Sequence, residues 1–211
     1  MEALLIGVAH VLDIEKRIRE ILEVEQPEAV AIELDPSRLY ALLNPDVRGK
    51  GDLMSRVLSG MEKKVADEYG VMPGSEMVAA YEYAREKQLP LYLIDKNFSE
   101  IMKGIRSVGL RERGKLLFSG IGSIFIPKRR LDKEMERLME NYDSAMKDFR
   151  KSFPKLARVL IDERNEHMIS ELLKIGINTV AVVGDAHVDG ISEGLKANGV
   201  EVREVRLRDL T

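Results

Sequence analysis

Two of the three histidines of this 211-residue chain lie in the same short sequence context. Residues 7–11 are Gly-Val-Ala-His-Val, and residues 184–188 are Gly-Asp-Ala-His-Val. A glycine at the end of a strand lets the backbone turn sharply, and the small alanine leaves room beside the imidazole. Two facing imidazoles with a carboxylate nearby form a metal site that can lower the pKa of a bound water. We therefore interpret His10 and His187 as metal ligands.

Two glutamates are candidates to complete this site. Glu33 ends the otherwise apolar run 29–34, where an ionised carboxylate costs desolvation free energy unless it is paired or bound to metal. Glu76 lies in the first turn of a predicted helix, where its charge also suits the helix dipole. One of the two would complete the metal shell, and the other would act as a general base on a metal-bound water.

Two aspartates follow predicted strands directly. Asp95 follows the apolar run 91–94 and could also cap the segment after it. Asp185 lies two residues before His187, where it would orient that imidazole as a hydrogen-bond acceptor or simply close the turn.

Arg164 interrupts an apolar stripe that recurs every four residues. The stripe consists of Leu156, Leu160, Met168 and Leu172. A basic side chain on such a face must meet a carboxylate or a polar cavity, or extend outward to solvent. In a catalytic site, Arg164 would stabilise an oxyanion or bind a substrate carboxylate. His167, on the same predicted helix, is interpreted as a solvated or locally hydrogen-bonded residue.

The pattern of apolar runs predicts the sheet that positions these side chains. Runs at 3–8, 29–34, 91–94 and 179–183 predict buried parallel strands, and the alternating run 200–205 predicts an edge strand. Ligands of open parallel sheets bind beyond the carboxyl ends of the strands. We therefore expect both histidines and the carboxylates at one edge of the sheet.

Helical periodicity fills the segments between the strands. Predicted starts are Asp13, Asp35-Pro36, Ser75 and Pro154, and further helices are expected at 53–65, 131–149 and 191–197. The alternation predicts an α/β fold, a mostly parallel sheet flanked by helices with a helical insertion. We expect one domain over 1–211, in which 97–175 forms a mainly helical insertion or covering layer.

Composition excludes several classes of protein. With 33 Lys and Arg against 36 Asp and Glu, the net charge of −3 argues against a nucleic-acid binder. The absence of cysteine excludes a disulfide scaffold, a thiolate metal site and a cysteine nucleophile. No signal peptide or run of about 18 apolar residues occurs, so we expect the chain in the cytoplasm or on the cytoplasmic face of a membrane.

Two further segments suggest partners. Residues 116–130 join an apolar stretch to a basic cluster, which favours contact with an anionic membrane surface, a subunit contact or a cover over a pocket. The apolar stripe of 131–149 suggests a homodimer.

Six motifs, in this order, resemble the TraB family of pheromone-shutdown proteins. They are Ile-Gly-Val-Ala-His-Val (6–11), Ala-Ile-Glu-Leu-Asp-Pro-Ser-Arg-Leu (31–39), Gly-Ser-Glu-Met (74–77), Leu-Ile-Asp-Lys-Asn (93–97), Asp-Glu-Arg-Asn-Glu-His-Met (162–168) and Val-Val-Gly-Asp-Ala-His-Val-Asp-Gly (182–190). The family is related to the Tiki metalloproteases, which carry paired Gly-x-x-His motifs. Its fold is placed near erythromycin esterase and the haem-binding ChaN proteins.

The resemblance implies roles for individual residues. His10 and His187 would be the paired motif histidines, and Glu33, Glu76 and Arg164 fall in the other motifs. Arg38, Asp95, Asp185 and Glu163 would support the site or contact the substrate. Many archaeal-type relatives carry membrane helices beyond this domain, so the resemblance also implies that the chain could be part of a longer membrane protein.

We expect a divalent-metal-dependent hydrolase, a peptidase acting on peptides or protein N-termini. The metal would be Mn, Co or Zn, which His and carboxylate ligands do not distinguish. Two alternatives stay open at this point. One is a peptide (pheromone)-binding or signalling module that does not cleave, and the weaker one is a haem- or iron-binding protein.

Overall fold

The fold is described from a computed structural model, which describes residues 1–9, 14–44, 74–109, 112 and 142–210. Within these residues five strands form one sheet in the order β3-β2-β4-β1-β5, and all neighbouring pairs are parallel. The strands are β1 (Glu2–Val8), β2 (Ala29–Ile32), β3 (Leu91–Leu93), β4 (Thr179–Gly184) and β5 (Glu201–Val205). The predicted α/β class with a parallel sheet is confirmed.

Helices connect the strands. Two of them begin where the sequence provides a capping side chain or a proline. Asp35 caps α2, accepting a hydrogen bond from the backbone N–H of Ser37 at 2.9 Å, and Pro154 is the first residue of α9. The described helices are α1 (Glu15–Glu25), α2 (Pro36–Leu43), α4 (Ser75–Glu86), α5 (Phe98–Ser107), α8 (Tyr142–Ser152), α9 (Pro154–Ala157), α10 (Glu163–Ile175), α11 (Asp185–Ala197) and α12 (Leu207–Leu210).

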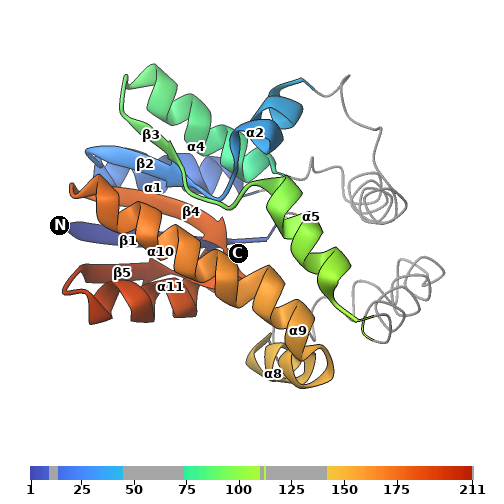
Figure 1. The fold of residues 1–211 in the computed structure, drawn as a ribbon. Coiled ribbons are helices and arrows are strands. Elements are labelled where there is room, and N and C mark those ends of the chain that lie inside the picture. The colour runs from blue at the N-terminus through green and yellow to red at the C-terminus, as the bar shows by residue number, and fades with distance from the viewer. Residues whose placement is uncertain (10–13, 45–73, 110–111, 113–141, 211) are drawn as a thin grey trace, which may run out of the picture.

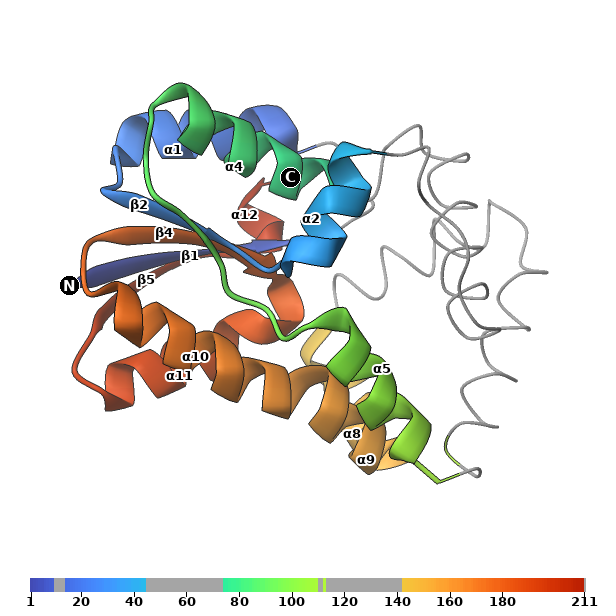
Figure 2. The ribbon, with the colours of Figure 1, turned by 45° about the horizontal axis from the view of Figure 1, so that its top comes forward.

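Two layers of helices cover the sheet, α1 and α4 on one face and α10 and α11 on the other (Figures 1 and 2). Alternate side chains of β1 enter the two cores. Leu4 and Ile6 pack on the α1 and α4 side, whereas Ala3 and Leu5 pack on the α10 and α11 side. Because both faces are buried, the central strands are continuous apolar runs rather than alternating ones.

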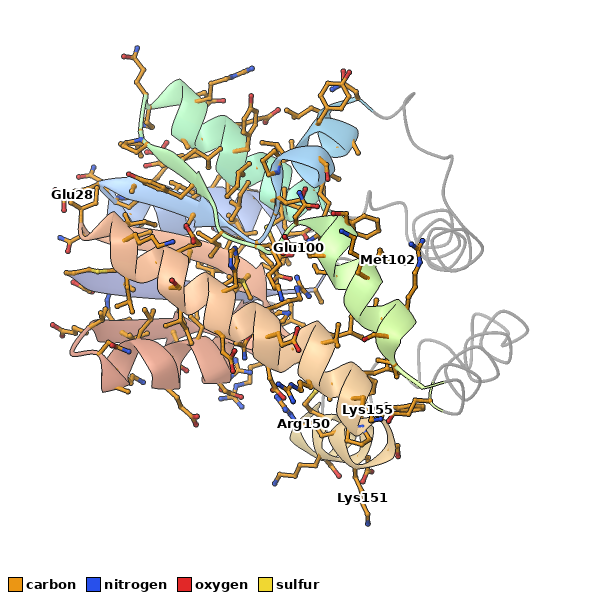
Figure 3. The ribbon with its side chains drawn as sticks, viewed as in Figure 1. Glu28, Glu100, Met102, Arg150, Lys151 and Lys155 are labelled. Atoms are coloured by element: carbon orange, nitrogen blue, oxygen red, sulfur yellow. The ribbon has the colours of Figure 1, made fainter. Side chains whose placement is uncertain are left out.

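A third group of helices, α5, α8 and α9, lies beyond the carboxyl ends of the strands (Figure 1). Figure 3 shows Met102 on α5 at this end of the molecule and Glu28, just before β2, at the opposite end. These helices have a small core of their own, made by Ile101, Met102, Ile105, Val108, Leu156 and Val159. Glu112 caps α9 by accepting hydrogen bonds from the backbone N–H groups of Lys155 and Leu156, both at 3.2 Å.

The helix predicted to begin at Pro154 is interrupted by one π-helical segment, Arg158–Asp162, and continues as α10 to Ile175. The backbone N–H of Glu163 bonds to the carbonyl of Arg158, five residues earlier. Such segments add one residue to a turn, so they shift the faces of the helix before and after them, and they are frequent at functional sites. This one directly precedes Arg164.

The helix that carries His187 begins earlier than predicted. We expected a short helix at 191–197, but α11 starts at Asp185, directly after β4. Two glycines in this segment, Gly190 and Gly194, weaken its helical pattern in the sequence. His187 therefore lies in the first turn of a helix rather than in a loop.

Two other expectations need correction. β3 is an edge strand, not a buried one, because it pairs only with β2 within the described sheet, and Tyr92 is 37% exposed. The N-cap of α4 is Gly74, with a φ of 88°, and not Ser75. The left-handed backbone that glycine adopts readily leads the chain into the helix, so that Ser75 becomes the first helical residue. The predicted edge position of β5 is confirmed.

Some predictions fall outside the described residues. These are His10, the Asp13 cap, the 53–65 helix, the 116–130 membrane or subunit contact, and the first part of the 131–149 helix. The suggested homodimer through 131–149 stays a prediction. Among the helices that the structure describes, none has the length and apolar character to cross a membrane.

Gly7, at the end of β1, gives a test of how the sheet and α11 pack. A methyl group added there would lie 2.2 Å from Oδ1 of Asp185, whose carboxylate is fixed by hydrogen bonds from Arg206 and from the N–H of Leu207. We expect Gly7→Ala to lower the free energy of unfolding by about 1–3 kcal/mol, measured by urea denaturation.

The matched control is Gly109→Ala, because a methyl group there has no atom of the described residues within 4 Å. Its stability should stay within about 0.5 kcal/mol of the wild type. Equal stability of the two variants would show that Asp185 moves aside freely.

Candidate functional site

The site centres on Arg164, at the start of α10, which contacts buried carboxylates from the ends of two strands. Its Nε donates to Oδ1 of Asp95 at 2.9 Å, and its Nη2 donates to Oδ2 of Asp95 at 2.7 Å and to Oε1 of Glu33. Glu33 follows β2, and Asp95 lies two residues after β3. Arg164 therefore meets carboxylates, which is one of the three outcomes that its place in the apolar stripe predicts.

The five N–H groups of Arg164 match five acceptors. Besides the two carboxylates, Nη1 contacts the carbonyl oxygen of Leu160 at 3.2 Å and Nε2 of His187 at 3.1 Å. An arginine has five donors and no acceptor. Arg164 would therefore have to exchange one of these contacts before it could bind a substrate carboxylate or an oxyanion.

His187 is buried between Arg164 and Asn165. Because the Arg164 guanidinium can only donate, Nε2 of His187 accepts, and Nδ1 carries the proton that it donates to Oδ1 of Asn165 at 2.6 Å. Burial lowers the pKa of His187, and the charge of Arg164 lowers it further against the opposing effect of Glu33. The imidazole is therefore held neutral, in one tautomer.

Glu33 is the most strongly perturbed carboxylate of the site. Burial opposes its ionisation, but His187, Arg164 and the backbone N–H of Gly184 together hold the pKa of Glu33 at about 2. Gly184 donates to Oε2 at 2.6 Å. Glu33 is therefore an ionised group at neutral pH, oriented from two sides.

Arg38, on α2, is the second arginine of the site. Its Nη1 donates to Oδ2 of Asp95 at 2.6 Å and lies 3.5 Å from the backbone oxygen of Glu33. Oδ2 of Asp95 thus bridges Arg38 and Arg164. The two guanidinium charges offset the two carboxylate charges, so the buried group is close to electrically neutral.

Asp185 contacts Arg206 rather than His187. Its Oδ2 accepts from Nη2 of Arg206 at 2.8 Å, and its Oδ1 accepts from Nε of Arg206 and from the backbone N–H of Leu207, both at 3.0 Å. Burial opposes ionisation of Asp185, but these hydrogen bonds lower its pKa. Asp185 thus ties the first turn of α11 to the segment after β5 and fixes the position of His187 through the backbone.

Two residues of the site were missed in the sequence. Asn165, the partner of Nδ1 of His187, fits against α11 because Gly190 has no side chain in its way. Arg206 directly follows β5. Had the rule about strand ends been applied to the fifth strand as well, it would have identified Arg206.

The structure does not bring all predicted residues into one cluster. Glu163 pairs with Lys96 (3.3 Å) and Arg158 (3.5 Å) near the surface. Glu76 is fully buried in the first turn of α4, on the opposite side of the sheet from α10 and α11. His10 lies outside the described residues.

Of the predicted metal donors in the described part of the chain, His187 and Glu33 lie close together. Nε2 of His187 and Oε1 of Glu33 lie 3.5 Å apart. Within that part, no group of three or more His, Cys, Asp and Glu side chains could hold a metal ion. The third predicted ligand, His10, is not among the residues described.

The family of the chain follows from a match to a family model over residues 2–204, which includes every site residue predicted from the sequence. The chain belongs to the TraB/PrgY/gumN family. The family resemblance predicted from the six motifs is therefore confirmed.

One curated protein is similar to this chain over nearly its whole length. It is the uncharacterized protein MJ1365 of Methanocaldococcus jannaschii, 29% identical over 222 aligned residues. The alignment covers 95% of the chain and 56% of the relative. The chain thus spans about half the length of the curated relative it matches.

His187 predicts a specific pH dependence of stability. Because its pKa is lowered in the folded state, the unfolded chain binds this proton more tightly. The contribution of neutral His187 to the free energy of unfolding is therefore fully present above pH 6.5. It is lost as the pH falls from 6.5 toward the lower pKa of His187 in the folded state. In EDTA, the free energy of unfolding of His187→Gln should fall less between pH 7.5 and 5.5 than that of the wild type.

His167→Gln is the matched control, since His167 lies on α10 and contributes no atom to the contacts described for His187. Its slope should follow that of the wild type. Identical slopes for His187→Gln and the wild type would mean that His187 is not held neutral by folding.

Proposed function

We propose that this chain is a divalent-metal-dependent hydrolase that acts on peptides. The observation that carries the proposal is the buried pair of Nε2 of His187 and Oε1 of Glu33, 3.5 Å apart beyond the carboxyl ends of the strands. Two ligands on one tetrahedral metal, each at about 2.0–2.2 Å, lie roughly 3.3–3.6 Å from each other. The separation in the structure fits that requirement.

The protonation states of the pair also suit metal binding. A histidine ligand must be neutral and a carboxylate ligand must be ionised. Burial lowers the pKa of His187, and the pKa of Glu33 is about 2. Both groups are therefore in the ligating form at neutral pH, so neither would have to release a proton to solvent before it could bind a metal ion.

Of the two glutamates, Glu33 suits the ligand role better. A general base works best with a pKa near the operating pH, and the pKa of about 2 makes Glu33 a weak proton acceptor. This leaves Glu76 as the proposed base. It lies in the first turn of α4, the helix that precedes β3, so the start of α4 is at the carboxyl-end edge of the parallel sheet.

His187 and Glu33 would hold the ion together with His10. A bound divalent ion would supply Lewis acidity and lower the pKa of a coordinated water. Arg164 now contacts the same Nε2 and Oε1 atoms, so it would release them and keep its two hydrogen bonds to Asp95. The N–H groups freed in this way would face the reacting group, where they could stabilise a developing oxyanion.

A second candidate function is a peptide-binding module that does not cleave. It is favoured by the complete pairing of Arg164, whose five donors already match acceptors of the chain itself. In such a module Arg164 would remain in place and the buried group would serve as a rigid floor for the bound peptide.

Cleavage assays separate the two functions. Peptide mixtures would be incubated with the protein and Mn²⁺, Co²⁺ or Zn²⁺, or with EDTA, and analysed by mass spectrometry. We expect metal-dependent cleavage that falls about hundredfold or more in His187→Ala, because a metal supplies several kcal/mol of transition-state stabilisation.

His167→Ala is the control and should cleave as the wild type does. Cleavage that persists in EDTA and in folded His187→Ala would contradict the metal mechanism. Intact peptides that nevertheless bind would favour the binding module.

Metal content tests the proposed ligands without any substrate. Elemental analysis of protein purified without added metal should find about one transition metal ion per chain. Glu33→Gln should lower this content because an amide is a weaker ligand than an ionised carboxylate. The same content in the wild type, Glu33→Gln and His187→Ala would place the metal elsewhere.

A further inference from the structure

Arg38 differs from Arg164 in how much of its guanidinium is used. Its two hydrogen-bond contacts, to Asp95 and to the backbone oxygen of Glu33, both involve Nη1. Among the described residues, no acceptor contacts its Nε or Nη2. The side chain is 29% exposed, against 12% for Arg164. Arg38 therefore presents unused donors toward solvent, whereas Arg164 presents none.

The unused donors form one edge of the guanidinium. Nε–H and one N–H of Nη2 point in parallel, and this edge matches the two oxygens of a carboxylate. Arg164 shows this geometry within the same site, since its Nε and Nη2 hold the two oxygens of Asp95 at 2.9 and 2.7 Å. A neutral carbonyl oxygen would not use both donors of the edge equally well.

The place of this edge relates it to the proposed reaction centre. One oxygen of Asp95 bridges Arg38 and Arg164, and Arg164 contacts both Glu33 and His187. A group bound by Arg38 would therefore lie close to the proposed metal ligands Glu33 and His187, which contact the neighbouring Arg164. Because the charges of the two arginines offset those of Glu33 and Asp95, an incoming anion would meet no net negative charge.

We propose that the free Nε–Nη2 edge of Arg38 binds a carboxylate of the substrate, and that the substrates are peptides carrying a carboxylate next to the bond at the reaction centre. This inference rests on the proposed function for the placement of that bond. The carboxylate is either the C-terminus of the peptide or an acidic side chain. Arg38 is thus a substrate-binding residue, and Arg164 orders the groups around it.

Binding of three peptide mixtures to metal-free protein in EDTA tests the proposal. The mixtures are acetylated tripeptides with a free C-terminus and no acidic residue, the same tripeptides as C-terminal amides, and amides that contain one glutamate. We expect one carboxylate-bearing mixture to bind about tenfold to hundredfold more tightly than the neutral amides, as charge-assisted hydrogen bonds typically give. The mixture that is preferred identifies the source of the carboxylate.

Arg38→Lys and Arg38→Gln should remove this preference, so that each variant binds the three mixtures with similar affinity. The lysine variant keeps the positive charge and loses only the two-donor edge, and thermal unfolding verifies that both variants fold. Arg158→Gln is the matched control, because Arg158 is an exposed arginine near the site that pairs with Glu163. It should keep the preference.

Equal affinity for all three mixtures, including undetectable binding of each, would overturn the proposal. So would a preference that survives in Arg38→Gln, or inorganic phosphate that binds more tightly than the carboxylate peptides. Cleavage is not measured in this experiment. A carboxylate preference without metal-dependent cleavage in the separate assay therefore refutes the hydrolase and supports the assignment of Arg38. Metal-dependent cleavage without the preference supports the hydrolase and refutes the assignment of Arg38.

Discussion

The arrangement of the site depends on one arginine, 12% exposed, that contacts two buried carboxylates and an imidazole. Glu33, Asp95 and His187 are each at most 5% exposed, and Arg164 contacts all three. Leaving a charge buried without its partner costs about 3–5 kcal/mol, so each member requires the others. The mutual pairing explains how one apolar sheet can carry so many ionisable groups at its edge.

The backbone around Arg164 prepares this contact. On a regular helix a four-residue repeat drifts by about 40° around the axis at each step. The π-helical segment at Arg158–Asp162 changes this register just before Arg164. Two glycines on neighbouring elements allow close packing around His187. Gly190 leaves room for Asn165, and Gly7 leaves room for Asp185. Close approach of the backbone at these two glycines thus allows the side-chain contacts that surround the imidazole.

The same network determines what the proposed binding of a metal would require. The lone pair of His187 that a metal ion needs is the one that Arg164 now occupies. The Glu33 oxygen nearest to His187 is also bound by Arg164. Metal binding and the closed arginine network are therefore competing states of the proposed site, and Asp95 is the partner that can keep Arg164 charged and paired in both.

The sequence by itself determined the parallel sheet, four of whose strands are apolar runs of the expected length, and the gathering of polar side chains at its carboxyl-end edge. It also pointed to Glu33 and Arg164, because a charge in an apolar strand or stripe is costly unless a partner compensates it. The six motifs pointed to the family, which the match over 2–204 confirmed.

Only the tertiary structure decided how these groups pair. Asp185 lies two residues from His187, yet it binds Arg206, which is 21 residues away along the chain. Arg164 bridges Glu33 over 131 residues and Asp95 over 69. Local sequence patterns indicate which residues are buried and whether a segment has helical or strand periodicity, and neither property depends on the partner of a given side chain. Pairing depends on strand order and on a helix register shift, which are properties of the packed chain.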